Sequence, residues 1–218
     1  MHTKAMAVGG QKGIKWTATP KGPHRKSESI TLGNMLKKLN LTDNTRESKK
    51  VIYSGMVEVD GIARTDPNYG AGLMDVVSIP KIKKSYRMVP EKNGIIFKEI
   101  SDKEAGIKPC RIVGKRLLPK GKVQVTFHDG TTLLMDKKVN VNDTLVLEMP
   151  KRKVKEVLPY APGSSAVVVH GRHRGKKGAI KEVIPGSAAR KSLTTIDAFQ
   201  TLTDYVFVIG KDKPVIEA

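Results

Sequence analysis

Two different hydrophobic periods divide the chain. Between residues 30 and 55, apolar residues recur at three- and four-residue intervals, which is the pattern of amphipathic helices. The first helix carries its apolar stripe on Leu32, Met35, Leu36 and Leu39. A second helix is predicted to begin at Asn44, with Glu47 as the partner of the N-terminal cap, and to end at Gly55, which accepts a positive φ.

The second helix should present one buried face and one exposed face. The buried face is expected to hold Ser48, Val51, Ile52 and Gly55. The exposed face is expected to hold Arg46, Lys49, Lys50 and Tyr53. Three cations on one helix face suit phosphate groups better than base edges.

From residue 57 on, short apolar runs alternate with turn signals, which indicates β-structure. Asp60-Gly61 predicts a tight hairpin before a strand over 73–79, so residues 30–80 are expected to form a small helix-helix-sheet domain. Residues 81–160 show no helical stripe. Their strands flank Asn93-Gly94 and Asp129-Gly130 and continue over 139–149 and 154–158, which predicts an all-β sandwich or barrel.

A third unit begins near residue 166. It reads as a strand over 166–170, a glycine-rich basic loop over 171–178, a strand over 179–184 and a late strand over 205–209. The predicted fold class is therefore α+β and multi-domain. The expected divisions are a basic extended arm over 1–29, domains over 30–80, 81–160 and 161–210, and a C-terminal tail over 211–218.

The charge of the chain points to a polyanionic partner. Its 218 residues include 40 Lys and Arg against 21 Asp and Glu, a net charge of +19. Residues 81–160 hold the largest surplus, with 19 basic and 9 acidic residues. Folding does not need this excess, which costs self-repulsion. The longest apolar stretches are far too short for a membrane helix, and no signal-peptide core precedes them, so we expect a cytosolic protein.

No catalytic constellation emerges from the sequence. The loop at Gly171 lacks the spacing of a nucleotide-binding P-loop. His170 and His173 have no third ligand and lie beside cations that repel a metal ion. Cys110 is the only cysteine, so no intrachain disulfide forms, and we interpret it as a small buried apolar residue. We expect no enzyme, no metal and no cofactor.

Structured RNA is the polyanion that these patterns favour. Aromatic residues make up 5% of the chain, too few for a stacking platform along a single strand. In the basic loop, glycines allow a close approach to phosphate and cations supply the countercharge. The candidate RNA-binding residues there are Gly171, Arg172, His173, Arg174, Gly175, Lys176, Lys177 and Gly178, and Arg64 is a further candidate in the first domain.

The first 29 residues combine cations with glycine and proline, a composition that cannot bury a core. We interpret this segment as an arm that a polyanion orders. Its only tryptophan, Trp16, requires either a groove on the protein or a base to stack on, and the sequence does not distinguish the two. The candidate RNA-binding residues of the arm are Lys12, Lys15, Trp16, Lys21, His24, Arg25 and Lys26.

Several stretches in one order resemble a known family. LTDNTRESKKVIYSGMVEVDG (41–61) and LMDVVSI (73–79) resemble the S-four RNA-binding domain of small-subunit ribosomal protein four of archaeal and eukaryotic type. KWTATPKGPH (15–24) is similar to that family's approach to the domain, and VNVNDT (139–144) to its central domain. VHGRHRGKKGAI (169–180) is similar to its KOW segment, and FVIGK (207–211) to its closing strand.

The resemblance implies a structural component of the small ribosomal subunit, with an all-β central domain, an SH3-like KOW barrel and no catalytic activity. The implied partners are small-subunit ribosomal RNA and neighbouring ribosomal proteins, with no membrane, small-molecule substrate or second copy of the chain. The compact length favours an archaeal member. Two rivals share parts of the pattern: an RNA-modifying enzyme with an S-four domain as its RNA handle, and a KOW-bearing transcription elongation factor.

Overall fold

The computed structural model describes residues 18–92, 94–135, 139–187, 190–211 and 214–216. These residues divide into two compact units, and each is considered by itself. The first unit comprises residues 18–89, 94–108 and 148–152, and the second comprises residues 90–92 and the described parts of 109–147 and 153–216.

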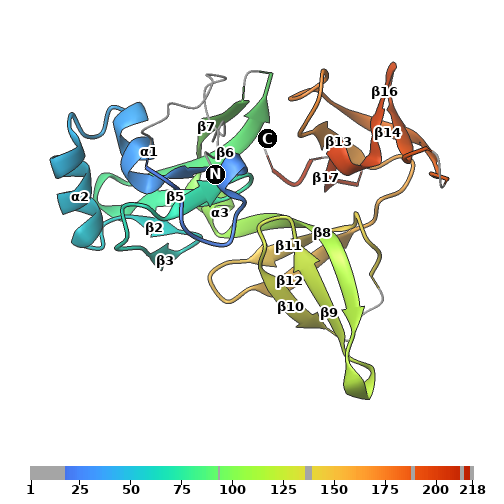
Figure 1. Ribbon diagram of the computed structural model, residues 1–218, viewed down its shortest axis with the longest axis horizontal. Coiled ribbons are helices and arrows are strands. Elements are labelled where there is room, and N and C mark those ends of the chain that lie inside the picture. The colour runs from blue at the N-terminus through green and yellow to red at the C-terminus, as the bar shows by residue number, and fades with distance from the viewer. Residues whose placement is uncertain (1–17, 93, 136–138, 188–189, 212–213, 217–218) are drawn as a thin grey trace. The chain divides into compact units, whose positions relative to one another are not determined.

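The first unit places two longer helices and a one-turn helix beside small antiparallel sheets (Figure 1). The helices are α1 (Leu32–Lys38), α2 (Thr45–Tyr53) and the one-turn α3 (Asp102–Ala105). One sheet pairs β1 (Ser29–Thr31) with β4 (Gly70–Gly72). The other has the order β3-β2-β5-β6-β7, made of β2 (Glu58–Val59), β3 (Ile62–Ala63), β5 (Val76–Ile79), β6 (Lys84–Glu91) and β7 (Gly94–Ile100).

Both helices form where the apolar period predicts them. The fully buried residues of the first stripe are Leu32, Met35 and Leu36. At the start of α2 the Asn44 side chain accepts a hydrogen bond from the backbone N–H of Glu47 at 2.9 Å, as expected of a capping residue. The Glu47 carboxylate accepts from the N–H of Asp43 instead of that of Asn44. Gly55, with φ of +69°, follows the end of the helix.

The Asp60-Gly61 hairpin is confirmed, with positive φ at both residues. The strand predicted over 73–79 is observed as the shorter β5, which pairs directly with β6, from Val76 opposite Arg87 to Ile79 opposite Lys84. The boundary expected at residue 80 therefore falls between two neighbouring strands of one sheet. The division of the chain into domains at that point stays a prediction.

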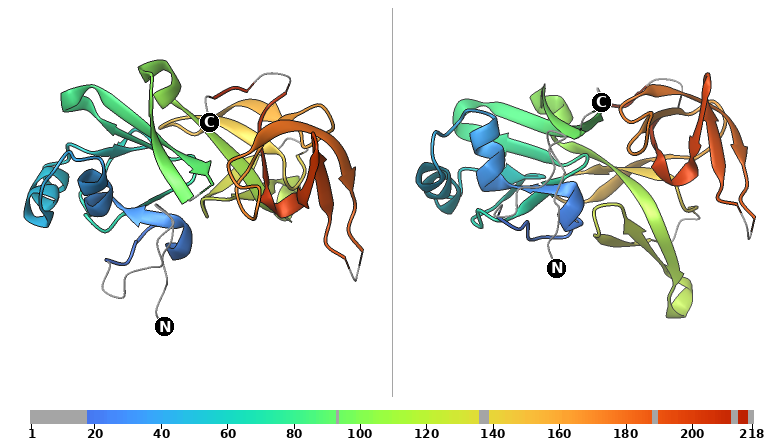
Figure 2. Two further views of the ribbon diagram at one scale, coloured as in Figure 1. Left: turned by 90° about the horizontal axis from the view of Figure 1, so that it is seen from above. Right: turned by 45° about the horizontal axis from the view of Figure 1, so that its top comes forward.

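The second unit contains two five-stranded sheets. The first has the order β10-β9-β8-β11-β12, made of β8 (Ile107–Leu117), β9 (Val123–Phe127), β10 (Thr132–Met135), β11 (Thr144–Glu148) and β12 (Lys153–Leu158). The second has the order β16-β15-β14-β13-β17, made of β13 (Ser165–Val168), β14 (Lys177–Ile184), β15 (Leu193–Ile196), β16 (Phe199–Leu202) and β17 (Val206–Gly210). Figure 2 shows the second sheet curled, as an SH3-like fold requires. The α+β class and its β-rich C-terminal half are confirmed.

The sequence pattern does not predict two elements of the second unit, strand β8 and the β15–β16 hairpin. The long strand β8 contains Pro109, Gly114 and several cations, which interrupt the alternation of apolar and polar residues. The hairpin of β15 and β16 turns at Asp197, which takes a φ of +45° without a glycine. Because no glycine marks that turn, the usual hairpin signal is missing.

Candidate nucleic-acid interface

The outer face of α2 carries the cations that the helix pattern predicts. Arg46, Lys49, Lys50 and Tyr53 are all exposed, and the Tyr53 ring is 62% exposed. Ser48 and Ile52 are buried on the opposite face, which holds the cationic face toward solvent. Together with Thr45, the four outer residues line an open pocket of about 520 Å³.

Two polar residues join this face without having been predicted. Thr45 lies four residues before Lys49 and eight before Tyr53, so helical spacing places it on the same side. Lys37, in the last turn of α1, donates a hydrogen bond from Nζ to Thr45 Oγ1 at 3.3 Å. The spacing within α2 was a signal for Thr45, whereas the contribution of Lys37 depends on how the two helices pack. We call Lys37, Thr45, Arg46, Lys49, Lys50 and Tyr53 the α2 face.

Three candidate cations with exposed side chains precede β1. Lys21 forms an ion pair with Asp66 at 3.5 Å, and Arg25 forms one with Glu28 at 3.9 Å. Lys26 is exposed in a short 3-10 helix, Lys26–Glu28. Exposed ion pairs of this kind contribute little to stability, so these side chains stay available to a phosphate. Lys12, Lys15 and Trp16 lie outside the described residues.

Arg64 combines exposure with a packing contact. Its guanidinium lies over the ring of Tyr69, 4.4 Å from the centroid, in a cation–π arrangement. Arg64 is half-buried, and desolvation by burial raises the pKa of Tyr69. The Arg64 side chain therefore packs within the first unit and is only partly accessible to a phosphate.

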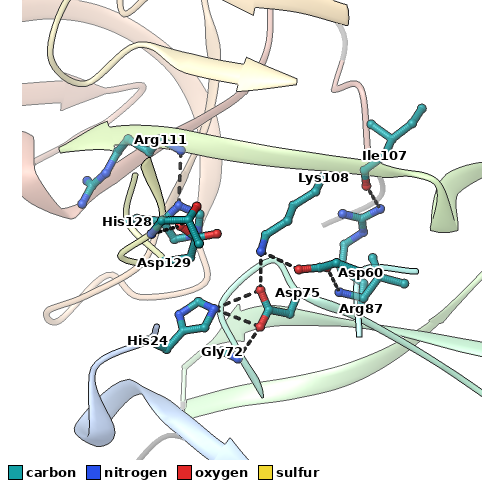
Figure 3. A network of polar contacts seen from close by, with 12 residues as sticks. His24, Asp60, Gly72, Asp75, Arg87, Ile107, Lys108, Arg111, His128 and Asp129 are labelled. Atoms are coloured by element: carbon teal, nitrogen blue, oxygen red, sulfur yellow. Dashed lines mark hydrogen bonds and ion pairs between the residues drawn. The ribbon is translucent and has the colours of Figure 1, made fainter. Parts of the chain in front are cut away.

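His24, predicted among the RNA-binding residues, is placed in the interior of the first unit (Figure 3). Its side chain is 4% exposed, and its Nε2 lies 2.9 Å from the Asp75 carboxylate. The ring packs so closely on Gly72 that a methyl group there would overlap it. A buried imidazole in this position orders the segment before β1, so we leave His24 out of the proposed surface.

Asp75 and Asp60 share a buried cation. Lys108, at the start of β8, places Nζ 2.6 Å from Asp75 Oδ1 and 2.7 Å from Asp60 Oδ2. The backbone N–H of Gly72 donates to Asp75, and that of Val76 donates to Asp60. We call His24, Asp60, Asp75 and Lys108 the buried charge cluster (Figure 3). The cluster joins segments that are far apart in the sequence, so no local sequence pattern predicts it.

Burial and charge act in opposite directions on the two carboxylates. Burial alone would raise the pKa of Asp75, but the charges of Lys108 and His24 and their hydrogen bonds hold it well below its ordinary value. At Asp60, burial is the larger influence, and the pKa is raised although Lys108 opposes the change. Lys108 is thus the counterion on which the cluster depends.

The glycine-rich loop between β13 and β14 is built on two left-handed glycines. Gly171 and Gly175 have φ of +83° and +81°, a conformation that favours glycine. The N–H of Gly175 donates to the carbonyl of Val168 at 2.8 Å, which closes the loop. Gly178 lies so close to Asp197 and Ile196 that no Cβ fits. These glycines therefore serve loop geometry and packing as well as access to the backbone.

The side chains of this loop divide between packing and exposure. His173 stacks on Phe199 with ring centroids 4.5 Å apart, and Lys176 Nζ lies 5.2 Å from the same ring. Arg174 is half-buried. Arg172, Lys176 and Lys177 are exposed. The loop thus brings cations to the surface, but not all eight predicted residues reach it equally.

The cysteine and histidines that the sequence analysis considered as a reactive thiol or metal ligands pack against other side chains. Cys110 is buried, at 1% exposure, as expected of a small apolar residue. His170 packs edge-on against Tyr205, whereas His173 stacks on Phe199. Within the described residues, no three His, Cys, Asp or Glu side chains gather as metal ligands. No helix of the described chain is long and apolar enough to cross a membrane.

Comparisons with known proteins agree with this architecture. Residues 24–83 match the sequence model of the S4 domain, and residues 82–154 match that of ribosomal family S4e. Small ribosomal subunit protein eS4 of Methanocella arvoryzae is 38% identical over 213 residues, which cover 95% of this chain and 91% of that one. The protein of the same name from Methanothermobacter thermautotrophicus is also 38% identical, over 94% and 88% of the two chains.

A solved structure shows the same fold. The crystal structure of 30S ribosomal protein S4e from Thermoplasma acidophilum superimposes with a TM-score of 0.76 at 29% identity, covering 84% of this chain and 96% of that chain. The agreement in sequence extends over nearly the whole length of both relatives. The chain therefore belongs to the S4e family of ribosomal proteins.

Proposed function

We propose that this protein is a structural constituent of the small ribosomal subunit that binds small-subunit ribosomal RNA by neutralising phosphates and fitting the shape of the folded strand. The observation that carries the proposal is the α2 face, which groups exposed Arg46, Lys49 and Lys50 around an open pocket beside Tyr53. Guanidinium and ammonium groups contact phosphates without reading sequence, which suits a structural role.

Further cations support the same function. The exposed candidate cations outside α2 are Lys21, Arg25, Lys26, Arg172, Lys176 and Lys177. The relatives are named as small-subunit ribosomal proteins, and the net charge of +19 suits an RNA partner. The proposed partners are ribosomal RNA and neighbouring proteins of the subunit, in the cytoplasm, and the proposed role is not enzymatic.

The α2 face provides the direct test. The triple variant Arg46→Ala, Lys49→Ala, Lys50→Ala should bind purified small-subunit ribosomal RNA several-fold more weakly, because three phosphate contacts are lost. Its plot of log affinity against log salt should become shallower by roughly 2. The variant should keep its unfolding midpoint, because all three side chains are exposed.

A matched control removes the same charge elsewhere. Lys153→Ala, Lys155→Ala, Lys181→Ala changes three exposed lysines of the second unit and should reduce RNA affinity less. Equal losses in both triple variants would show that net charge alone, not the α2 face, determines binding. The tagged chain should also co-sediment with small subunits in a sucrose gradient. Free sedimentation in moderate salt, or co-purification with RNA polymerase instead, would contradict the proposal.

A further inference from the structure

The end of the β8–β9 hairpin is a projection whose strands stay paired up to the turn. The two strands stay paired up to Leu117 opposite Val123, and the N–H of Leu118 donates to the carbonyl of Lys122 at 2.8 Å. The turn itself is a 3-10 helix, Pro119–Gly121, in which Gly121 has a φ of +73°. Figure 1 and the right view of Figure 2 show this end extending beyond the ends of the neighbouring strands of its sheet. We call residues 115–122 the hairpin end.

The hairpin end is strongly cationic. Its eight residues include Lys115, Arg116, Lys120 and Lys122, and the sequence contains no Asp or Glu between residues 105 and 128. Arg116 and Lys122 are exposed. Lys115 is anchored, since its Nζ donates to the carbonyl of Val139 at 2.9 Å. Four cations without a nearby acidic residue in the sequence produce a positive potential that attracts a polyanion.

An apolar side chain lies among these cations. Leu117 is 72% exposed, more than the other large apolar residues of the described chain. A single exposed leucine is ordinary on a protein surface. Here, however, it is held at the end of a paired ladder next to Arg116, and successive residues of a strand point to opposite sides. The hairpin end therefore presents a cation on one side and an aliphatic group on the other, as a ribbon inserted between two surfaces would.

We propose that the hairpin end is a second RNA-binding element, separate from the α2 face, which inserts into a junction or bulge of folded RNA. Arg116 and Lys122 contact phosphates there, and Leu117 packs on an unstacked base. An opened site is required because a base is free to pack against a side chain only where it is unstacked, as in loops and bulges. A protein partner would have to be acidic to match the charge. The proposal rests on the proposed function and adds a second contact to it.

Chemical footprinting of small-subunit ribosomal RNA with the full chain tests the proposal. The wild-type chain should protect at least two sets of nucleotides. Arg116→Glu with Lys122→Glu should abolish protection of one set and keep the set that the α2 triple variant loses, and should weaken affinity about ten-fold, as expected for two reversed phosphate contacts. Leu117→Ser should weaken affinity less and expose the bases of the first set.

The control is Lys153→Glu with Lys155→Glu, which reverses the same charge on exposed positions of β12 in the same sheet. It should leave both protected sets intact. If it removes the same set, or if the hairpin variant keeps every protection, the hairpin proposal is wrong while the proposed function stands. If the wild-type chain protects no RNA, the proposed function itself fails. Should the reversed variant melt at a lower temperature, Arg116→Ala with Lys122→Ala replaces it.

A tethered cleavage reagent gives an independent measurement. The single native cysteine, Cys110, is buried, so a cysteine introduced at the exposed turn position as Pro119→Cys can be labelled selectively with a reagent that generates hydroxyl radicals. Radicals from this position should cut the RNA at the set of nucleotides that Arg116→Glu with Lys122→Glu leaves unprotected. Cleavage confined to other nucleotides, or cleavage only of a neighbouring ribosomal protein in reconstituted subunits, would overturn the proposal.

Discussion

Lys108 is buried between the carboxylates of Asp60 and Asp75. Without its positive charge, keeping both buried carboxylates ionised would cost folding free energy. The Nζ of Lys108 is within 2.7 Å of both Asp60 and Asp75. Removing one partner of a buried ion pair leaves an uncompensated charge, which destabilises the fold more than replacing the whole pair with apolar residues. The stability of the first unit should therefore depend on this residue.

Replacing Lys108 with Met tests this dependence and has a pH signature. At pH 7 the substitution should cost about 3–5 kcal/mol of unfolding free energy. In the wild type, the pKa of Asp75 is lowered, so the stability that this carboxylate contributes is complete above the ordinary Asp value of 3.8 and is lost as pH falls below it. The raised pKa of Asp60 acts in the opposite direction. Without Lys108, burial and mutual repulsion raise the carboxylate pKa values, so part of the lost stability should return on acidification from pH 7.

Urea denaturation at several pH values measures both effects, with Lys155→Met, an exposed lysine, as the control. The control should follow the wild-type profile. Parallel pH profiles for Lys108→Met and the wild type would mean that Lys108 does not set the ionisation of the cluster.

The absence of a side chain at Gly72 leaves room for the imidazole ring of His24. The Gly72 position requires no unusual φ, but a methyl group there would overlap the imidazole ring. We expect Gly72→Ala to cost about 1–3 kcal/mol, as other overpacking substitutions do. Gly106→Ala is the matched control, because its added methyl group would meet nothing within 4 Å. In thermal unfolding, adding His24→Ala to Gly72→Ala should cost less than the sum of the single changes; simple additivity would contradict the packing relation.

At the scale of elements, α2 depends on its first residue. Asn44 accepts the hydrogen bond from Glu47 that caps the helix. Asn44→Ala should lower the unfolding free energy by about 1 kcal/mol, whereas Asn44→Asp keeps a capping oxygen and should be nearly neutral. Chemical denaturation of the two variants distinguishes them. Because Asn44 is not among the cations of the α2 face, RNA affinity should change little while the helix remains folded.

For the whole molecule, the excess charge predicts the dependence of RNA binding on salt. A chain of net charge +19 that neutralises six or more phosphates should show a slope of log affinity against log salt steeper than about −4, since counterions are released on binding. Filter binding with small-subunit ribosomal RNA between low and moderate salt measures the slope. A value near zero would remove the electrostatic basis of the proposal.

The local patterns were sufficient for the elements whose causes are local. The spacing of Leu32, Met35 and Leu36 determined α1, Asn44 and Gly55 marked α2, and Asp60-Gly61 marked a hairpin. The same helix spacing placed Arg46, Lys49 and Lys50 on one exposed face. A helix period or a turn residue acts over a few neighbours, so the sequence alone carries this information.

Only the tertiary structure decided the features that depend on distant partners. His24 looks like one more polar residue of a basic arm, yet its ring lies against Asp75, 51 positions further on. Lys108 looks like one cation among 40, and it is buried because Asp60 and Asp75 converge on it. The ionisation and exposure of a side chain follow from what the fold brings to it, and pairings across such sequence distances leave no periodic trace in the chain.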